Sequence, residues 1–180
     1  MKLLALSGSL RKQSYNTAAN QALQTISPNN IEILLFQNMA NIPLFNPDIE
    51  ENTPPAIAEL KALIAACDGL IISSPEYAHG ITGVMKNTLD WLVSGEEFID
   101  KPVMFINTSP RASHAQESLR EIVNTMSGNI SDEACLSIPL LGSALDAKGI
   151  TQTPELTTPL KTSLKVFQTF INNTSNKISK

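Results

Sequence analysis

The sequence predicts a doubly wound α/β domain with five parallel strands in the order 2-1-3-4-5 and helices on both faces. Short apolar runs alternate with segments whose apolar residues recur at helical spacing. The runs contain almost no polar residues, which is typical of strands buried on both faces of a parallel sheet. The chain has 180 residues and 42% hydrophobic content, enough for one substantial core. With right-handed crossovers, this strand order is the simplest arrangement of five such units.

Five apolar runs are expected to form the sheet. Each is short, rich in Leu, Ile, Val or Phe, and bounded by the Gly, Pro, Ser or Asn residues that commonly end a strand. In chain order, the expected strands are 3–6, 31–36, 69–73, 101–106 and 134–138.

Helical segments separate these runs, with apolar residues three and four positions apart. The expected helices are 16–26, 57–66, 82–93, 115–126 and 159–171. The stretch 41–55 carries four prolines among polar residues and is expected to be a long loop. We expect residues 1–172 to form a single domain and residues 173–180 a polar tail that frays.

Composition excludes several classes of protein. The net charge is −4, so no broad basic surface for nucleic acid or an anionic membrane is expected. No apolar run approaches transmembrane length, and the run after Lys2 is too short for a secretory signal, which together favour a cytoplasmic location. Cys67 and Cys135 lie in apolar surroundings and are expected to be buried, reduced thiols. His79 and His114 have no second ligand nearby in the sequence, so no metal site is expected.

The segment 7–16 (Ser-Gly-Ser-Leu-Arg-Lys-Gln-Ser-Tyr-Asn) follows the first strand and leads into the first helix. A helix N-terminus offers unpaired N–H groups and the positive end of the helix dipole to an anion. Serine and asparagine side chains add donors, and Arg11 adds a guanidinium suited to phosphate. The single glycine disfavours both the P-loop and the G-x-G-x-x-G dinucleotide fingerprint. A solvated, capped turn explains the same residues equally well.

The predicted topology adds a second observation. Strand order reverses between strands 1 and 3, so the loops 7–16, 73–83 and 107–114 should meet at the carboxyl ends of the strands. In the second loop, Pro75 stiffens the strand exit, Tyr77 supplies an aromatic face, and two glycines let the backbone approach a ligand. A phosphate cradle facing an aromatic loop fits a flat heteroaromatic phosphate ester such as FMN.

Two motifs carry a resemblance to a known family. The first is Gly-Ser-Leu-Arg-Lys at 8–12, followed by Ser14 and Asn16. The second is Ser-Pro-Glu-Tyr at 74–77, followed by the helical segment 83–92 with its Leu-Asp-Trp-Leu. Together they resemble the NADPH-dependent FMN reductase family, which includes quinone, azo-dye and chromate reductases of flavodoxin-like fold. The resemblance extends over about residues 2–170.

This resemblance implies a flavodoxin-like domain with non-covalently bound FMN, and NADPH or NADH as co-substrate. The phosphate contacts that it implies are Ser9, Arg11, Ser14 and Asn16. The contacts along the isoalloxazine ring that it implies are Pro75, Glu76, Tyr77, His79 and Gly80. The bound FMN would carry the redox step, so no protein residue is expected to be catalytic.

The chain departs from the family pattern in two loops. Ala78 and His79 stand where the family commonly has Asn and Gly, so a polar contact to the ring is either lost or replaced by His79, which otherwise is an exposed polar residue. The third loop contains no glycine, and its expected ring contacts are Ser109 and Arg111. Arg111 could instead attract the phosphate of the nicotinamide cofactor.

The sequence also bears on the partners of the protein and leaves two other classes of protein open. The partner is a small-molecule electron acceptor, and the resemblance implies a homodimer or homotetramer with Trp91, Leu92 and Phe98 as candidate interface anchors. Two other classes stay open: a flavodoxin-type electron carrier that does not turn over nicotinamide, and a protein that retains the fold without flavin. The electron carrier would favour a strongly acidic surface around the flavin.

Overall fold

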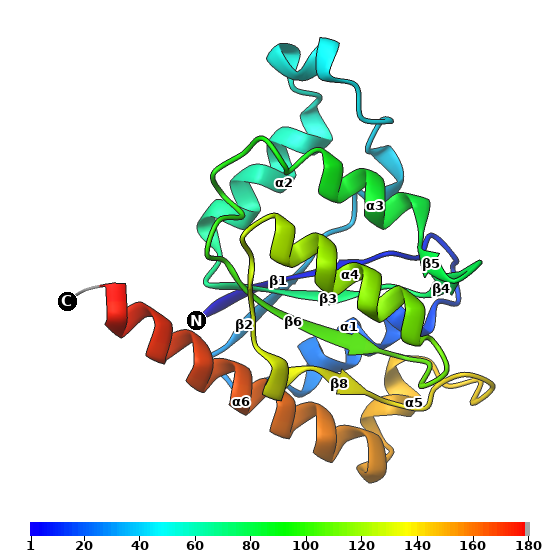
Figure 1. Cartoon of the computed structure of the whole chain (residues 1–180). Coiled ribbons are helices and arrows are strands. Elements are labelled where there is room, and N and C mark those ends of the chain that lie inside the picture. Colours follow the sequence, from blue (N-terminus) through cyan, green and yellow to red (C-terminus); the bar gives the residue numbers. More distant parts are fainter. Residues whose placement is uncertain (179–180) are drawn as a thin grey trace.

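A computed structural model describes residues 1–178 and contains a central parallel sheet (Figure 1). Four of its strands follow the predicted runs: β1 (Lys2–Ser7), β2 (Glu32–Leu35), β3 (Gly69–Ser73) and β6 (Pro102–Asn107). They lie in the order β2-β1-β3-β6, and every neighbouring pair is parallel. The predicted doubly wound topology is therefore confirmed.

The fifth position of the sheet is divided between two short strands. β7 (Asn129–Ile130) pairs with the start of β6, and β8 (Leu136–Ser137) pairs with its end. A 3-10 turn at Asp132–Ala134 separates them. Just before this turn, the Ser131 N–H donates the last hydrogen bond from β7 to β6, to the Val103 carbonyl. The predicted single strand at 134–138 is thus corrected to two pieces, and only the second lies within the predicted range.

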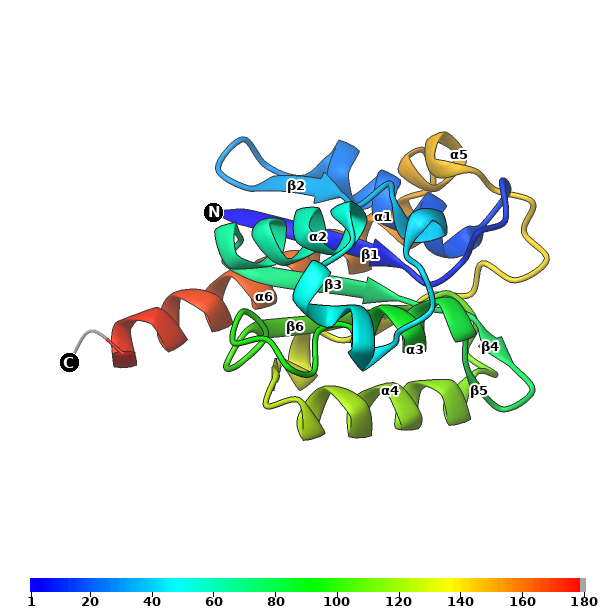
Figure 2. The same ribbon diagram turned by 90° about the horizontal axis from the view of Figure 1, so that it is seen from above.

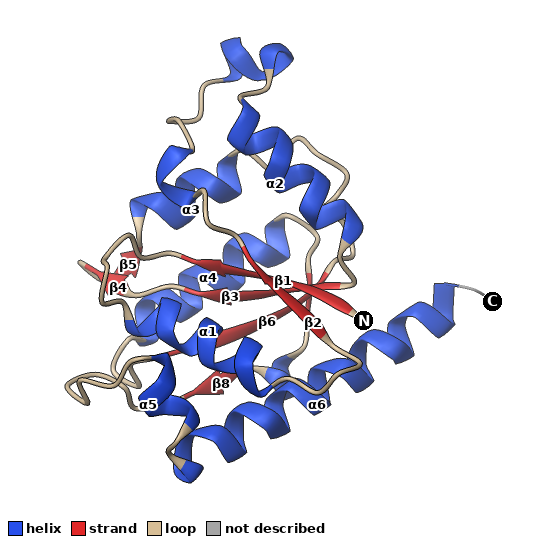
Figure 3. Cartoon of the chain, turned by 180° about the vertical axis from the view of Figure 1, so that it is seen from behind, coloured by secondary structure: helices blue, strands red, loops and turns tan. Residues whose placement is uncertain are grey.

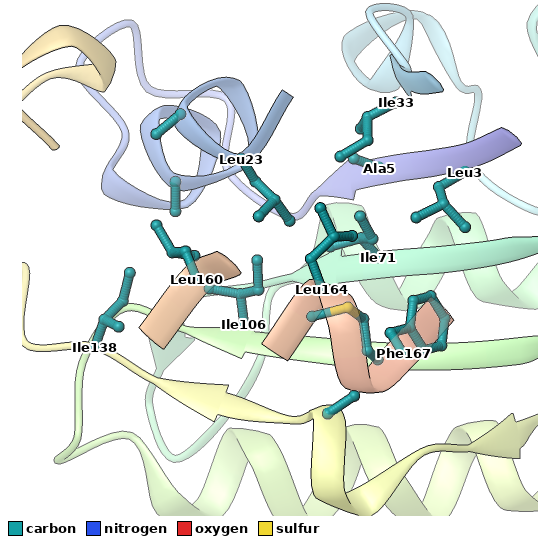
Figure 4. Packing of buried hydrophobic residues seen from close by; sticks show 14 of the residues in the cluster. Leu3, Ala5, Leu23, Ile33, Ile71, Ile106, Ile138, Leu160, Leu164 and Phe167 are labelled. Atoms are coloured by element: carbon teal, nitrogen blue, oxygen red, sulfur yellow. The ribbon is translucent and has the colours of Figure 1, made fainter. Parts of the chain in front are cut away.

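Two helical layers cover the sheet, as Figures 1 and 3 show. One layer contains α2 (Pro55–Ala66), α3 (Gly83–Asp90) and α4 (Ser113–Thr125). The other contains α1 (Tyr15–Ile26), α5 (Ala147–Thr151) and α6 (Pro154–Ile178). Alternate residues of β1 serve the two layers, because Leu3 and Ala5 pack with the second layer while Leu4 and Leu6 pack with the first. Figure 4 shows Leu3 and Ala5 beside Leu164 and Phe167 of α6.

The helix boundaries differ from expectation mainly near the C-terminus. Helix α6 begins at Pro154 rather than at residue 159, and Pro159 lies inside it. It also continues to Ile178, beyond the expected end at residue 171, and so includes most of the stretch 173–180 that was expected to be a polar tail; residues 179–180 lie outside the described part of the chain. A 3-10 turn at Met39–Asn41 leads into the long proline-rich loop 41–55, and a second one at Pro47–Asn52 lies inside it. None of the helices described between residues 1 and 178 is both long and apolar enough to cross a membrane.

The predicted interface anchors are buried inside the chain, which contradicts that prediction. Trp91, Leu92 and Phe98 are each at most 1% exposed. The Trp91 Nε1 donates to the Pro43 carbonyl at 2.8 Å, and its ring meets that of Phe45 edge-to-face. Trp91 thus contacts the 41–55 loop, while Leu92 and Phe98 belong to the core of the chain, so none of the three faces a second subunit.

Gly8 lies where the first and second loops touch, and a larger side chain at this position is expected to destabilise the fold. A Cβ at this position would come within 2.4 Å of the Ser74 Oγ and 2.9 Å of the Ser74 Cβ. We expect Gly8→Ala to lower the free energy of unfolding by about 1–3 kcal/mol through overpacking, measured by urea denaturation. Gly83→Ala is the matched control: a Cβ there meets nothing within 4 Å, and alanine favours the helix. Equal stability of the two variants would contradict the prediction.

Candidate functional site

Three loops meet at the carboxyl end of the sheet, as predicted. Figure 2 shows strands β1, β3 and β6 all ending on this side, next to the hairpin formed by β4 (Glu76–Tyr77) and β5 (Gly80–Ile81). A cavity of about 190 Å³ lies between the loops. Its lining comprises Ser9, Arg11, Ser14, Tyr15, Asn16, Pro75, Glu76, Tyr77, Asn107, Thr108, Ser109, Ala112 and Leu141.

Short backbone contacts bring the first two loops together. The Gly8 N–H donates to the Ser73 carbonyl at 2.8 Å, and the Thr82 hydroxyl donates to the Gly8 carbonyl at 2.7 Å. The same Thr82 Oγ1 accepts from the Met85 N–H and so caps α3. One residue therefore ties the first loop to the start of the helix that follows the second loop.

The first turn of α1 offers donors to the cavity. Ser14 caps the helix by accepting from the Thr17 N–H, but the N–H groups of Tyr15 and Asn16 make no hydrogen bond with any other residue between 1 and 178. Asn16 is only 4% exposed, and its Oδ1 accepts from the Thr108 hydroxyl at 3.2 Å. Within the described chain, its Nδ2 has no hydrogen-bond partner, and Asn16 lines the cavity. An unpaired amide nitrogen beside free helix N–H groups fits a phosphate.

A buried polar network fixes this turn from below. The Ser73 hydroxyl bonds to the Asn20 Oδ1 at 3.1 Å and to the Asn16 carbonyl at 3.2 Å. The Asn20 Nδ2 in turn donates to the Leu6 carbonyl. Because the hydrogen-bonded polar groups are buried, the geometry of the α1 N-terminus is specified by the ends of β1 and β3.

The second loop makes a tight turn with unfavourable residues. Tyr77 and Gly80 are paired across a two-residue turn in which Ala78 has φ 50° and His79 has φ 59°. Both central residues therefore adopt the left-handed conformation that favours Asn-Gly in such a hairpin. The turn holds Pro75 and Tyr77 at the cavity, and the Tyr77 side chain is half exposed there.

The Glu76 carboxylate is turned toward helix α4. Its Oε2 accepts from the Ala115 N–H at 2.9 Å, and its Oε1 lies 3.1 Å from the His79 Nδ1. The hydrogen bond from the Ala115 N–H, aided by the one from His79, lowers the pKa of Glu76 below its ordinary value. Glu76 thus stays ionised and contacts the first turn of a helix, where negative charge is favourable.

The predicted site residues divide into two groups. Ser9, Arg11, Ser14, Asn16, Pro75, Glu76, Tyr77 and Ser109 line the cavity. His79, Gly80 and Arg111 lie outside its lining. His79 faces Glu76, and its ring lies 4.5 Å from that of His114, while Arg111 is exposed and belongs to none of the ion pairs within residues 1–178.

Several lining residues were not predicted. Asn107 and Thr108 follow the fourth strand, so the rule that ligands bind at strand carboxyl ends could have identified them. Tyr15 lies between two predicted contacts, and its hydroxyl accepts from the Ala144 N–H. Leu141 comes from the loop after β8, which the sequence pattern did not connect to the site.

The fold and the site together define a doubly wound α/β protein with a turn of unpaired N–H donors and an aromatic loop beside one cavity at its switch point. The family model for NADPH-dependent FMN reductases matches residues 1–139. The chain belongs to this family.

Relatives of known name agree with this assignment. An NAD(P)H-dependent FMN reductase of Pseudomonas aeruginosa is 33% identical over 155 residues, covering 83% of each chain. A quinone reductase of Escherichia coli is 32% identical over 130 residues, covering 68% of this chain and 69% of its own. Among solved structures, FerB, a flavoenzyme NAD(P)H:(acceptor) oxidoreductase from Paracoccus denitrificans, superposes with a TM-score of 0.84 at 24% identity, covering 96% of this chain and 97% of its own.

The strained turn gives a prediction on stability. Glycine at position 78 would adopt the observed φ without the penalty that alanine incurs, so we expect Ala78→Gly to raise the free energy of unfolding by about 0.5–1 kcal/mol. Ala58→Gly, on an exposed face of α2, is the control and should lower it by about as much. Both changes can be measured by urea denaturation, and destabilisation by Ala78→Gly would contradict the prediction.

The lowered pKa of Glu76 gives a prediction on pH. A carboxyl whose pKa is lower in the folded state stabilises the fold above its unfolded pKa of about 4.3, and this stabilisation is lost as the pH falls through the folded pKa. We therefore expect the stability difference between the native chain and Glu76→Gln to shrink on acidification below about pH 4.3. Thermal unfolding at a series of pH values measures it. The same comparison with Glu117→Gln, an exposed residue of α4, should change less.

Proposed function

We propose that the protein is an FMN-dependent NAD(P)H oxidoreductase that passes electrons from NADPH or NADH through bound FMN to a small-molecule acceptor. The acceptors proposed are quinones, free flavin, azo compounds and oxidised metal ions. The observation that carries this proposal is the set of unpaired donors at the start of α1, which faces the second loop across one cavity. Membership of the family and the names of the relatives support it.

The residues present fit the phosphate end of FMN. Ser14, Asn16 and the free N–H groups of the first helical turn would hold the phosphate, and Arg11 would neutralise it. Ser9 lies on the same wall of the cavity. This donor set needs no rearrangement, because Asn16 is already held in place by Thr108 and by the Ser73–Asn20 network.

The ring would lie between the second and third loops. Pro75 and Tyr77 of the second loop and Thr108, Ser109 and Ala112 of the third loop all line the cavity. FMN, when bound, supplies the transfer of reducing equivalents from the nicotinamide to the acceptor. The protein's part is to orient the ring and to direct backbone N–H groups and the Tyr77 side chain at its edge, where they would stabilise negative charge.

Charge around the cavity disfavours the electron-carrier alternative. None of the ion pairs formed within residues 1–178 involves Arg11, Lys12 or Arg111. Arg11 lines the cavity, and Lys12 is the next residue in the chain. Arg111 lies in the third loop, two residues after the lining residue Ser109. Unpaired cations suit an anionic dinucleotide better than the acidic docking surface of a carrier. Arg111, outside the lining, is proposed to attract the nicotinamide cofactor rather than to contact the ring.

Assembly and location are also proposals. The exposed large apolar side chains include Leu44, Phe45 and Ile49 on the 41–55 loop and Val93 after α3. They replace the buried Trp91 as candidate contacts of a homodimer or homotetramer. A cytoplasmic location is proposed because both cysteines are free and the charge balance is ordinary.

An assay with purified protein tests the proposed function. We expect the chain to bind FMN and to oxidise NADPH or NADH in the presence of a quinone, followed by absorbance. Asn16→Leu removes the unpaired amide nitrogen and should weaken FMN binding at least tenfold, since a hydrogen bond to a charged group contributes about 1.5–3 kcal/mol. Bound flavin without nicotinamide oxidation would support an electron carrier, and absence of flavin binding would support a protein that has lost the cofactor.

Gln21→Leu is the matched control for Asn16→Leu. It makes the same kind of change in α1 at an exposed position outside the 190 Å³ cavity. Its affinity for FMN should equal that of the native chain.

A further inference from the structure

Helix α4 begins without a cap of its own. Its N-cap residue is Ala112, whose methyl side chain cannot accept a hydrogen bond. The acceptor comes instead from another loop, because the Glu76 Oε2 binds the Ala115 N–H at 2.9 Å. These two residues are 39 positions apart in the sequence.

A second contact joins the same two elements. The His79 Nδ1 lies 3.1 Å from the Glu76 Oε1, and the His79 ring packs edge-to-face against His114 in the first turn of α4. Glu76 is the buried member of this group, with a side chain 13% exposed against 77% for His79. Both carboxylate oxygens are thus engaged with protein groups beside α4.

Both joined elements contribute to the lining of the cavity. Pro75 and Tyr77 flank Glu76 on the second loop, while Ala112, which immediately precedes α4, lines the cavity together with Ser109. The bridge from Glu76 to Ala115 therefore connects two segments that both line the cavity.

We propose that Glu76 is a positioning residue that clamps the second loop to helix α4, setting the width of the cavity for the flavin ring without contacting the ring through its carboxylate. This inference rests on the proposed function and assigns Glu76 a role different from the ring contact that the family resemblance implies. Each oxygen of the Glu76 carboxylate already has a protein partner, Ala115 for Oε2 and His79 for Oε1.

Three variants test the clamp. Glu76→Ala removes the acceptor, Glu76→Gln keeps an amide oxygen for the Ala115 N–H, and Glu117→Ala removes a carboxylate from the exposed face of α4 without touching the second loop. FMN affinity is measured by quenching of flavin fluorescence, and the environment of the ring by visible circular dichroism. We expect Glu76→Ala to weaken FMN binding about tenfold and to change the dichroism spectrum, in keeping with the loss of one helix cap.

The conservative variant separates a clamp from a direct contact. Glu76→Gln should stay within about threefold of the native affinity and keep the native spectrum, because the neutral side chain preserves the bridge. Glu117→Ala should match the native chain in both measurements. Equal losses in Glu76→Gln and Glu76→Ala would show that the charge itself acts on the ring, and native behaviour of Glu76→Ala would show that no clamp exists; either result overturns the inference.

Hydrogen exchange of the flavin-free protein tests the clamp independently of the proposed function. The amides of residues 112–118 and 76–82 should exchange faster in Glu76→Ala and at the native rate in Glu76→Gln and Glu117→Ala. If native protein binds no FMN while the exchange pattern is as expected, the proposed function and the clamp's role toward flavin fail, but the bridge itself stands. Unchanged exchange in Glu76→Ala overturns the bridge even if FMN binds.

Discussion

The parallel register of β1 and β3 is the constraint on which the site depends. Ser7 lies opposite Ser73, so the first and second loops leave the sheet at the same level and on adjacent strands. The Gly8 N–H can then reach the Ser73 carbonyl, and Thr82 can reach the Gly8 carbonyl. A shift of one residue would turn every side chain of β1 to the opposite layer, which the buried residues on both faces forbid. The cavity therefore inherits its geometry from the packing of the core.

Much of the fold could be predicted because strands buried on both faces of a parallel sheet have continuous apolar sequences. The positions of β1, β3 and β6 follow their sequence closely. The predictions failed where the structure depends on contacts with residues that are distant in the sequence or departs from a usual local preference. A proline such as Pro159 usually begins a helix, yet here the chain continues a helix that started at Pro154. The burial of Trp91 could not be foreseen either, because the Pro43 carbonyl that it bonds is 48 positions away.

The part of the cavity lining that comes from the first loop was predictable in the same way, since Ser14 and Asn16 lie at the start of α1, directly after the first predicted loop. The ring-facing half was less so. The Glu76 carboxylate binds the uncapped N-terminus of α4, a helix that starts much later in the chain. His79 contacts Glu76 and does not line the cavity. Motif reasoning places such residues near a ligand but does not reveal which neighbour their polar atoms choose.

The bridge from Glu76 to Ala115 also bears on how this scaffold can be altered. Because α4 takes its first-turn acceptor from the second loop, residues 107–112 and the β4–β5 hairpin do not behave as separate modules. A chimera that exchanged only the third loop with that of a relative would pair a new helix start with a carboxylate placed for the old one. The two segments together are the smallest unit that can be transplanted with its geometry intact.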